Sequence, residues 1–254
     1  MLIIKNIDIN LSTDEILESL CNNPHKTGDK KNTKKIQHHQ TNVKGDFFVA
    51  NIDNKISDII ELCLNKTRTC IRAKLLARWF DIKEVKNEKV YFIDLNKKLI
   101  VLDLGFSSKF LKEANTALFS VYTIGDELEA NAAKASLEGD FLKSYIYDII
   151  GLLYLKKIGT YVNEIVEKKA HDIGWGVGPF LSPGSVHGWE LSGQNLLCSA
   201  LPINEIDVEI NEYSVLIPQK SLSCLIAIGS QYQNKKVGST CDHCTSKELC
   251  QMKY

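Results

Sequence analysis

The sequence lacks a surplus of charge of either sign, because 31 lysines and arginines balance 31 aspartates and glutamates. A chain without net charge has no overall field to attract nucleic acid or an anionic membrane surface. Long uninterrupted apolar runs are missing too, since the longest apolar helical segment, residues 141–166, carries charged side chains along its length. Such a helix should not span a bilayer. We therefore expect neither a nucleic-acid partner nor a membrane.

The sequence also shows no export signal, because its first residues alternate like a β-strand and lack the apolar stretch of a signal peptide. The eight cysteines are then expected to be reduced thiols of a cytoplasmic protein. No Ser/His/Asp or Cys/His arrangement can be assembled into a nucleophile with its base. The glycine spacing fits neither the dinucleotide-binding nor the phosphate-binding fingerprint.

What is present is a group of cysteines near the carboxyl end, at Cys241, Cys244 and Cys250. The C-x2-C spacing lets two thiolates bind one centre from a tight turn, and the spacer that follows brings the third within reach. Zinc would form a closed structural site, whereas an iron–sulfur cluster would add one-electron chemistry. Unliganded thiols, or a disulfide if the protein is exported, are the third alternative. Spacing alone does not identify the metal.

A fourth ligand for this group must come from elsewhere in the chain, or the site stays open. Cys224 is the preferred candidate because it lies in an apolar run, residues 222–228, just upstream of the cysteines. Cys198 is the second candidate. His243, between the first two cysteines, is expected to be a solvated loop residue.

Apolar periodicity and turn residues predict a mixture of helices and strands. A polar segment, residues 22–46, carries six lysines between Lys26 and Lys44 and is expected to be a mobile basic surface loop; a contact for an acidic partner is the alternative. Ser12 or Thr13 is the expected cap of the first helix and Ser192 of the last. Strands are expected at 2–9, 90–95, 99–104, 117–122, 206–210 and 222–228, and helices within 57–80 and at 127–137, 140–170 and 194–200.

Glycines and prolines gather between the two last helices, and they predict a loop over residues 174–188. Long loops of this composition are usually functional, because glycine lets a backbone approach a ligand and leaves amides exposed. Trp175 and Trp189 flank the loop and would offer flat apolar surfaces to a planar ring system. Lys220 and Ser221 precede the last strand and would suit an anionic group. A purely structural loop is the alternative.

Residues 181–194 read LSPGSVHGWELSGQ, and this run resembles the S-P-G…W-x-L-S-x-Q signature of the methionine synthase activation domain family. The resemblance keeps its order over roughly residues 65–254. It is closest to the small stand-alone members found with corrinoid methyltransferase systems, several of which end in a cysteine cluster. The other matching features are Thr123-Ile124-Gly125 followed by Leu128-Glu129, Gly139-Asp140, Asp148 with Gly151, and Pro218-x-Lys220-Ser221-x-Ser223.

In the parent enzyme of this family the domain binds S-adenosylmethionine and presents it to the corrinoid, so that cob(II)alamin, once reduced, is remethylated. The resemblance implies an α+β fold with a twisted, largely antiparallel sheet packed with helices. It implies a corrinoid protein or a corrinoid-dependent methyltransferase as the partner. The residues expected to face the cofactor are Trp175, Ser182, Pro183, Gly184, His187, Gly188, Trp189, Lys220 and Ser221.

The same resemblance favours an iron–sulfur cluster over zinc, because zinc has no redox chemistry with which to return cob(II) to cob(I). The expected metal ligands are Cys241, Cys244, Cys250 and Cys224. Two departures from the family pattern count against S-adenosylmethionine. Phe180 and Leu181 stand near the position of the family's arginine, and a helix glutamate is replaced around residues 155–156.

The sequence thus predicts an accessory amino-terminal portion over residues 1–60, an activation-domain-like core over 61–240, and a cysteine tail over 241–254. The leading hypothesis is a reactivation factor that docks on its corrinoid partner and supports reduction of cob(II) to cob(I), with or without methylation from S-adenosylmethionine. The alternative is a non-catalytic corrinoid- or partner-binding module whose tail holds structural zinc.

Overall fold

The computed structural model describes residues 1–22, 43–185 and 188–239. The chain forms two compact units. The first, called the sheet unit, contains Met1–Ile9, Arg72–Asp126 and the chain from Tyr154 on. The second, called the helical unit, contains Asn10–Ile71 and Glu127–Leu153. Helix α4 (Phe141–Asp172) is divided between them after Leu153.

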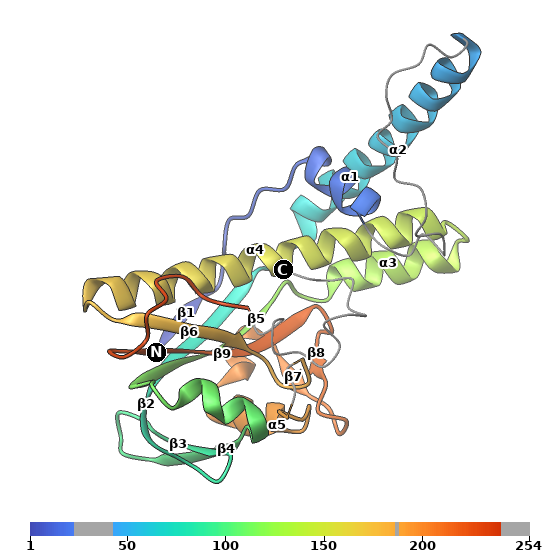
Figure 1. The fold of residues 1–254 in the computed structure, drawn as a ribbon. Coiled ribbons are helices and arrows are strands. Elements are labelled where there is room, and N and C mark those ends of the chain that lie inside the picture. Colours follow the sequence, from blue (N-terminus) through green and yellow to red (C-terminus); the bar gives the residue numbers. More distant parts are fainter. Residues whose placement is uncertain (23–42, 186–187, 240–254) are drawn as a thin grey trace. The chain divides into compact units, whose positions relative to one another are not determined.

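The sheet unit is built on one seven-stranded sheet in which every strand pair is antiparallel (Figure 1). The strand order is β4-β3-β2-β5-β9-β6, and β1 also pairs with β2. This arrangement confirms the predicted α+β class with a largely antiparallel sheet. The strands are β1 (Leu2–Ile4), β2 (Lys74–Lys86), β3 (Lys89–Ile93), β4 (Leu99–Asp103), β5 (Thr116–Thr123), β6 (Gly176–Leu181) and β9 (Ser221–Gly229).

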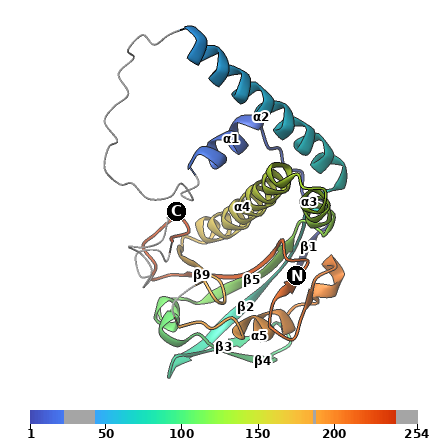
Figure 2. The same ribbon diagram turned by 90° about the vertical axis from the view of Figure 1, so that its right-hand side faces the viewer.

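Both faces of the sheet are covered, because all residues of β5 after Thr116 are buried. On one face lies the second half of α4 (Figures 1 and 2), where Gly159 leaves room for the ring of Tyr122. On the other face Phe119 and Leu225 belong to the main apolar core. The elements that cover this second face are η1 (Gly105–Leu111), α5 (Gly193–Ser199), η2 (Ile203–Ile206), β7 (Glu209–Ile210) and β8 (Leu216–Ile217).

The helical unit consists of α1 (Thr13–Asn22), α2 (Val43–Cys70), α3 (Glu127–Leu137) and the first half of α4. Ser12 caps α1 as predicted: the backbone N–H of Glu15 donates to its hydroxyl at 3.2 Å, and the Glu15 carboxylate accepts from the backbone N–H of Ser12 at 2.9 Å. This reciprocal pair is a capping box. No helix in the described part of the chain is long and apolar enough to cross a membrane.

Several predicted elements are confirmed because local pattern determines them. The β3–β4 hairpin, β5, α3, α4, α5 and β9 all lie within a few residues of their expected bounds. The predicted helix of residues 57–80 is only half right, because its second part is strand β2. Leu75, Leu76 and Ala77 are all buried in the middle of the sheet. A strand that is covered on both faces shows no alternation, so its apolar run resembles a buried helix.

Two further predictions are corrected by the structure. The first predicted strand is shorter than expected and ends at Ile4. The strand expected at 206–210 is reduced to two residues, because η2 runs to Ile206 and Asp207 takes a left-handed conformation with φ +57°. The Asp207 side chain explains the local turn, since aspartate tolerates this conformation better than most residues.

Candidate functional site

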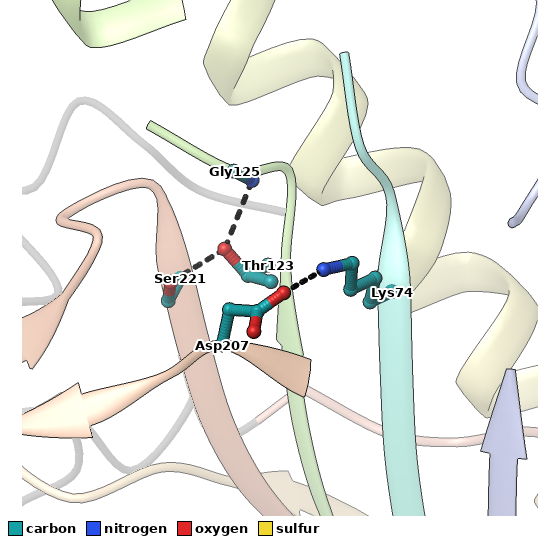
Figure 3. A network of polar contacts seen from close by, with 5 residues as sticks. All are labelled: Lys74, Thr123, Gly125, Asp207 and Ser221. Atoms are coloured by element: carbon teal, nitrogen blue, oxygen red, sulfur yellow. Dashed lines mark hydrogen bonds and ion pairs between the residues drawn. The ribbon is translucent and has the colours of Figure 1, made fainter. Parts of the chain in front are cut away.

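Three polar residues form a row across the middle of the sheet, at the end where β5 finishes. Lys74 of β2 is the register partner of Thr123 of β5, and Thr123 is in turn the register partner of Ser221 of β9. Residues two apart on a strand share a face. The row therefore continues the core face of the sheet and gives it a polar end (Figure 3).

The hydroxyl of Thr123 is the centre of this row. It accepts hydrogen bonds from the Ser221 hydroxyl at 2.8 Å and from the backbone N–H of Gly125 at 3.1 Å (Figure 3). It also donates to the carbonyl of Lys220 at 3.4 Å. A hydroxyl has one donor and two acceptor positions, so Thr123 uses all of them. Thr123 therefore fixes residues 123–125 in position relative to Lys220 and Ser221. Its hydroxyl is not available as a nucleophile.

Lys74 completes the row by an ion pair with Asp207 (Figure 3). The Lys74 side chain is 18% exposed and the Asp207 side chain 79%. The hydrogen bond from Lys74, and its positive charge, hold the pKa of Asp207 below its ordinary value. The pair thus links the turn after η2 to the first residue of β2, although an ion pair this exposed adds little stability.

The pH dependence of this pair is a testable consequence. Because the pKa of Asp207 is lowered by folding, the pair stabilises the fold above the unfolded pKa of about 3.9, and the contribution is lost as the pH falls through the folded pKa. An Asp207→Asn variant should unfold at a lower urea concentration than the wild type near neutral pH. In strong acid the two midpoints should coincide. Glu205→Gln, which removes an exposed charge from η2, is the control.

A second polar network joins the signature segment, residues 181–194, to β9. The Ser182 hydroxyl donates to the carbonyl of Ser223 at 2.8 Å, and the Ser223 hydroxyl donates to the side-chain oxygen of Gln194 at 2.9 Å. The Gln194 amide then donates to the carbonyl of Ser214 at 2.6 Å. The first three side chains are at most 8% exposed. Ser182, Gln194 and Ser223 thus bring two separate motifs of the family pattern into one buried network.

The turn after Ser182 is closed by backbone bonds. Gly184 takes φ +76°, a left-handed conformation that favours glycine, and its N–H donates to the carbonyl of Trp189 at 2.8 Å. The Ser185 hydroxyl donates to the carbonyl of Ser182 at 2.9 Å. Gly184 and Ser185 are exposed at this turn, whereas Pro183 is buried. The turn therefore offers backbone and a small hydroxyl to solvent.

Trp189 supports this turn from the inside. It is 1% exposed and belongs to the main core, and its ring N–H has no hydrogen-bond partner within the described residues. Gly193 packs against the ring so closely that an added Cβ would lie 2.3 Å from the ring nitrogen. The indole is therefore part of the core and does not offer a flat face at the surface.

The predicted loop over residues 174–188 is corrected, because its first half is strand β6. Trp175 is half-buried and precedes the strand, while Ser182 follows it, so the two lie about 20 Å apart at the rise of a β-strand. Gly176 has a packing role that sequence reasoning missed, since an added Cβ would lie 2.1 Å from the carbonyl oxygen of Tyr232.

The structure also brings η1 to the signature segment, which the sequence did not suggest. A Cβ added to Gly105 would lie 2.2 Å from the carbonyl oxygen of Gly188, and one added to Gly188 would lie 2.8 Å from the backbone nitrogen of Phe106. Phe106 is 47% exposed, and the Lys109 ammonium lies 3.5 Å from the centre of its ring. An aromatic ring and a cation therefore stand beside Gly188.

The remaining predicted residues are placed as follows. Lys220 and Ser221 are half-buried at the row described above. Leu181, near the position of the family's arginine, is 1% exposed and belongs to the core. Cys198 is buried in the same core, and burial raises the pKa of its thiol to about 12. His187 and the cysteines at 241, 244 and 250 lie outside the described residues.

Cys224 lies inside the sheet unit, on the face opposite to Ser223. Its side chain is 0% exposed, its register partner is Ser120, and burial raises the pKa of the thiol far above its ordinary value. Within residues 1–22, 43–185 and 188–239, no three His, Cys, Asp or Glu side chains are grouped so that they could hold a metal ion. The metal hypothesis therefore depends on the tail.

Taken together, the polar end of the sheet face is suited to binding rather than to acid–base chemistry. The Ser221 hydroxyl donates to Thr123, the Ser223 hydroxyl donates to Gln194, and the carboxylate of Asp207 is paired with Lys74. The groups that the neighbouring turn exposes are the backbone of Gly184, the Ser185 hydroxyl and the side chain of Leu191, which is 40% exposed. These groups fit a large neutral ligand with amide or hydroxyl substituents better than a strongly charged one.

No family model matches the sequence, and no curated protein matches it significantly. Among solved structures, the fold is similar to the crystal structure of the MetH reactivation domain bound to AdoHcy. The similarity has a TM-score of 0.59 and covers 93% of this chain and 81% of that chain, at 10% sequence identity. At this identity the likeness establishes the fold. This is the fold that the signature segment led us to expect.

Proposed function

We propose that this protein reactivates a corrinoid protein or a corrinoid-dependent methyltransferase, by docking on it and supporting the return of cob(II) to cob(I). One observation carries the proposal. Ser182, Gln194 and Ser223, which come from two motifs of the activation-domain pattern, share one buried network in a fold like that of the MetH reactivation domain. Neither the motifs nor the fold would be as informative alone.

In this proposal the signature segment is the surface that meets the corrinoid. Corrinoids carry amide side chains around a largely apolar ring, and the segment exposes backbone at Gly184, the Ser185 hydroxyl and the apolar side chain of Leu191. The hydrogen bonds at its base hold these groups in one conformation, which lowers the entropy cost of binding. Phe106 and Lys109 extend the same surface beyond Gly188.

The electron would enter through a metal centre on the tail. Cys241, Cys244 and Cys250 would hold it, and an iron–sulfur cluster, when bound, supplies one-electron chemistry. Cys224 is a poor fourth ligand, because a metal would have to enter the interior of the sheet unit to reach it. We therefore assign the three tail cysteines to the proposed site and leave its remaining position to a partner or a small ligand.

The test is anaerobic purification of the full chain, followed by iron, sulfide and zinc analysis and by EPR spectroscopy after reduction with dithionite. We expect about four irons and four sulfides per chain, as in a cubane cluster. The EPR signal should disappear in Cys241→Ser and persist in Cys21→Ser. The loaded protein should then reduce a cob(II)-containing partner. One zinc and no sulfide would overturn electron transfer and leave the alternative, a binding module with a structural zinc tail.

The methyl donor is a separate question. The MetH reactivation domain was crystallised with AdoHcy, but the position near which its family carries an arginine is occupied here by the buried Leu181. Calorimetric titration with S-adenosylhomocysteine decides the matter. Saturable binding would support methylation from S-adenosylmethionine as part of the function. An absence of heat would restrict the function to reduction.

A further inference from the structure

The seven-stranded sheet has two edges, and the protein covers the one formed by β6. The chain that follows β9 lies alongside this strand. The N–H of Val177 donates to the carbonyl of Asn234 at 2.8 Å. The N–H of Phe180 donates to the carbonyl of Gly238 at 3.0 Å. Glu167 of α4 fixes the covering segment by accepting a hydrogen bond from one of its backbone N–H groups at 2.9 Å. The backbone groups of the β6 edge are therefore not open to another chain.

Strand β4 forms the other edge of the sheet. Among the segments that the structure describes, none pairs with its outer side. All residues of β4 before Asp103 are apolar, and the strand contains neither a proline nor a bulge that would protect it. Leu99 is 50% exposed and Val101 is half-buried. An apolar edge strand of this kind is a template for pairing with a further strand.

The hydrogen bonds at the two ends of the β3–β4 hairpin identify the backbone groups that β4 leaves open. The N–H of Asp94 donates to the carbonyl of Lys98 at 3.1 Å, and the N–H of Leu104 donates to the carbonyl of Glu88 at 3.0 Å. In an antiparallel pair, residues that bond to the neighbouring strand alternate with residues that point away from it. The residues that turn their backbone groups away from β3 are therefore Leu99, Val101 and Asp103.

We propose that β4 is the docking surface for a second copy of this chain, and that two copies join their sheets through antiparallel β4 strands about a two-fold axis at Val101. In this register Val101 faces its own equivalent, and Leu99 of each copy faces Asp103 of the other. Each facing pair exchanges two backbone hydrogen bonds, so that about six form in all. The same groups are used on both sides, as a two-fold interface requires.

The charges at the two ends of β4 favour this antiparallel pairing. Lys97 and Lys98 precede the strand, and Asp103 ends it. Antiparallel copies bring the lysines of each chain toward Asp103 of the other, whereas parallel copies would bring like charges together. Asp103 is also the register partner of Lys89 on β3, so in the pair it would have cations on both sides.

The covered β6 edge limits the assembly to two copies. Pairing between sheet edges continues from chain to chain when both edges of each sheet are open. Here one of the two edges is covered, and a two-fold pair uses the open edge of both copies at once. The result is a closed dimer with one continuous sheet. This inference goes beyond the proposed function and does not depend on it.

The first test is the molar mass of the full chain, measured by analytical ultracentrifugation over a range of micromolar concentrations. We expect the mass of two chains at the upper end of the range. Val101→Lys places two lysines opposite each other at the axis and should weaken the association about tenfold or more. Leu137→Lys, which makes the same kind of change at a leucine of α3 that is 90% exposed, is the control and should leave the mass unchanged.

Cysteine substitutions test the register. Facing residues of a hydrogen-bonded pair have Cα atoms about 5.5 Å apart, which is within the range of a disulfide. Val101→Cys should therefore give a covalent dimer on mild oxidation. Asp103→Cys should give no more than the wild type, because its two equivalents would lie about 13 Å apart along the strands. The other cysteines are the same in all three proteins.

A wild-type chain that stays monomeric throughout the concentration range would overturn the proposal. Undiminished association of Val101→Lys would do the same, and so would equal cross-linking by the two cysteine variants. Circular dichroism of each variant shows whether the fold is kept. Because every variant retains the tail cysteines, the iron and sulfide content of the same samples reports separately on the proposed function.

Discussion

A Gly105→Ala variant should lose about 3 kcal/mol or more of its free energy of unfolding, which is at the upper end of single-substitution effects. An added Cβ would lie 2.2 Å from the carbonyl oxygen of Gly188. Neither partner of that contact is a flexible side chain, so η1 and the signature segment must separate. Gly105 also has φ +51°, a conformation that costs an L-residue about 1–2 kcal/mol by itself. Urea unfolding followed by circular dichroism measures the loss.

The control for this prediction is Gly174→Ala. Gly174 also lies in the sheet unit and has φ +73°, but a Cβ there would meet nothing within 4 Å. It should therefore lose only the conformational part, about 1–2 kcal/mol. The difference between the two variants isolates the backbone contact. Equal losses would mean that η1 does not pack against Gly188 as described, and Phe106 and Lys109 would then have no place in the proposed surface.

Replacing Gln194 by leucine should cost about 2–4 kcal/mol and should loosen the signature segment. The substitution keeps the size of the side chain but leaves the Ser214 carbonyl and the Ser223 hydroxyl without their partner. Each buried polar group left unpaired costs about 1–3 kcal/mol. Gln194 is 6% exposed, so water replaces the lost bonds poorly. We expect amide hydrogen exchange at Gly184 and Ser185 to speed up beyond the change in global stability.

Asn195→Ala is the matched control, because Asn195 is exposed and its side-chain amide donates to the hydroxyl of Ser214 at 2.7 Å. It should cost under about 1 kcal/mol and leave exchange at Gly184 unchanged. If Gln194→Leu behaves like this control, the network does not hold the signature segment. The segment would then have to be ordered by its corrinoid partner, and the preorganised surface in our proposal would be lost.

Several parts of this fold follow from local sequence. The β3–β4 hairpin comes from alternating apolar residues on either side of a turn, and α4 from its apolar stripe after Gly139. The capping box joins Ser12 and Glu15, which are three positions apart in the sequence. In each case the interactions that define the element join residues a few positions apart. Such patterns can be recognised without knowing what covers them.

The predictions that the structure corrects failed because they depend on contacts between residues far apart in the sequence. Gly176 looks like a loop residue because glycine is common in loops, but here it lies in a strand against which the backbone of Tyr232 packs. Trp189 looks like an exposed stacking surface, but it is 1% exposed. The apolar run before Phe80 gives no alternation because the sheet is covered on both faces. What decides each of these is a neighbour far away along the chain.

The sequence by itself determined which motifs this protein carries: a run like the activation-domain signature, the T-I-G and K-S-x-S motifs, and three cysteines at its end. Only the tertiary structure decided that these motifs meet. Thr123 bonds to Ser221 across 98 positions, and Ser182 bonds to Ser223 across 41. The register of β5 and β9 creates the first contact, and the pairing of β6 with β9 creates the second. Packing on the two buried faces sets these registers, because a shift by one residue would move every side chain of a strand to the opposite face.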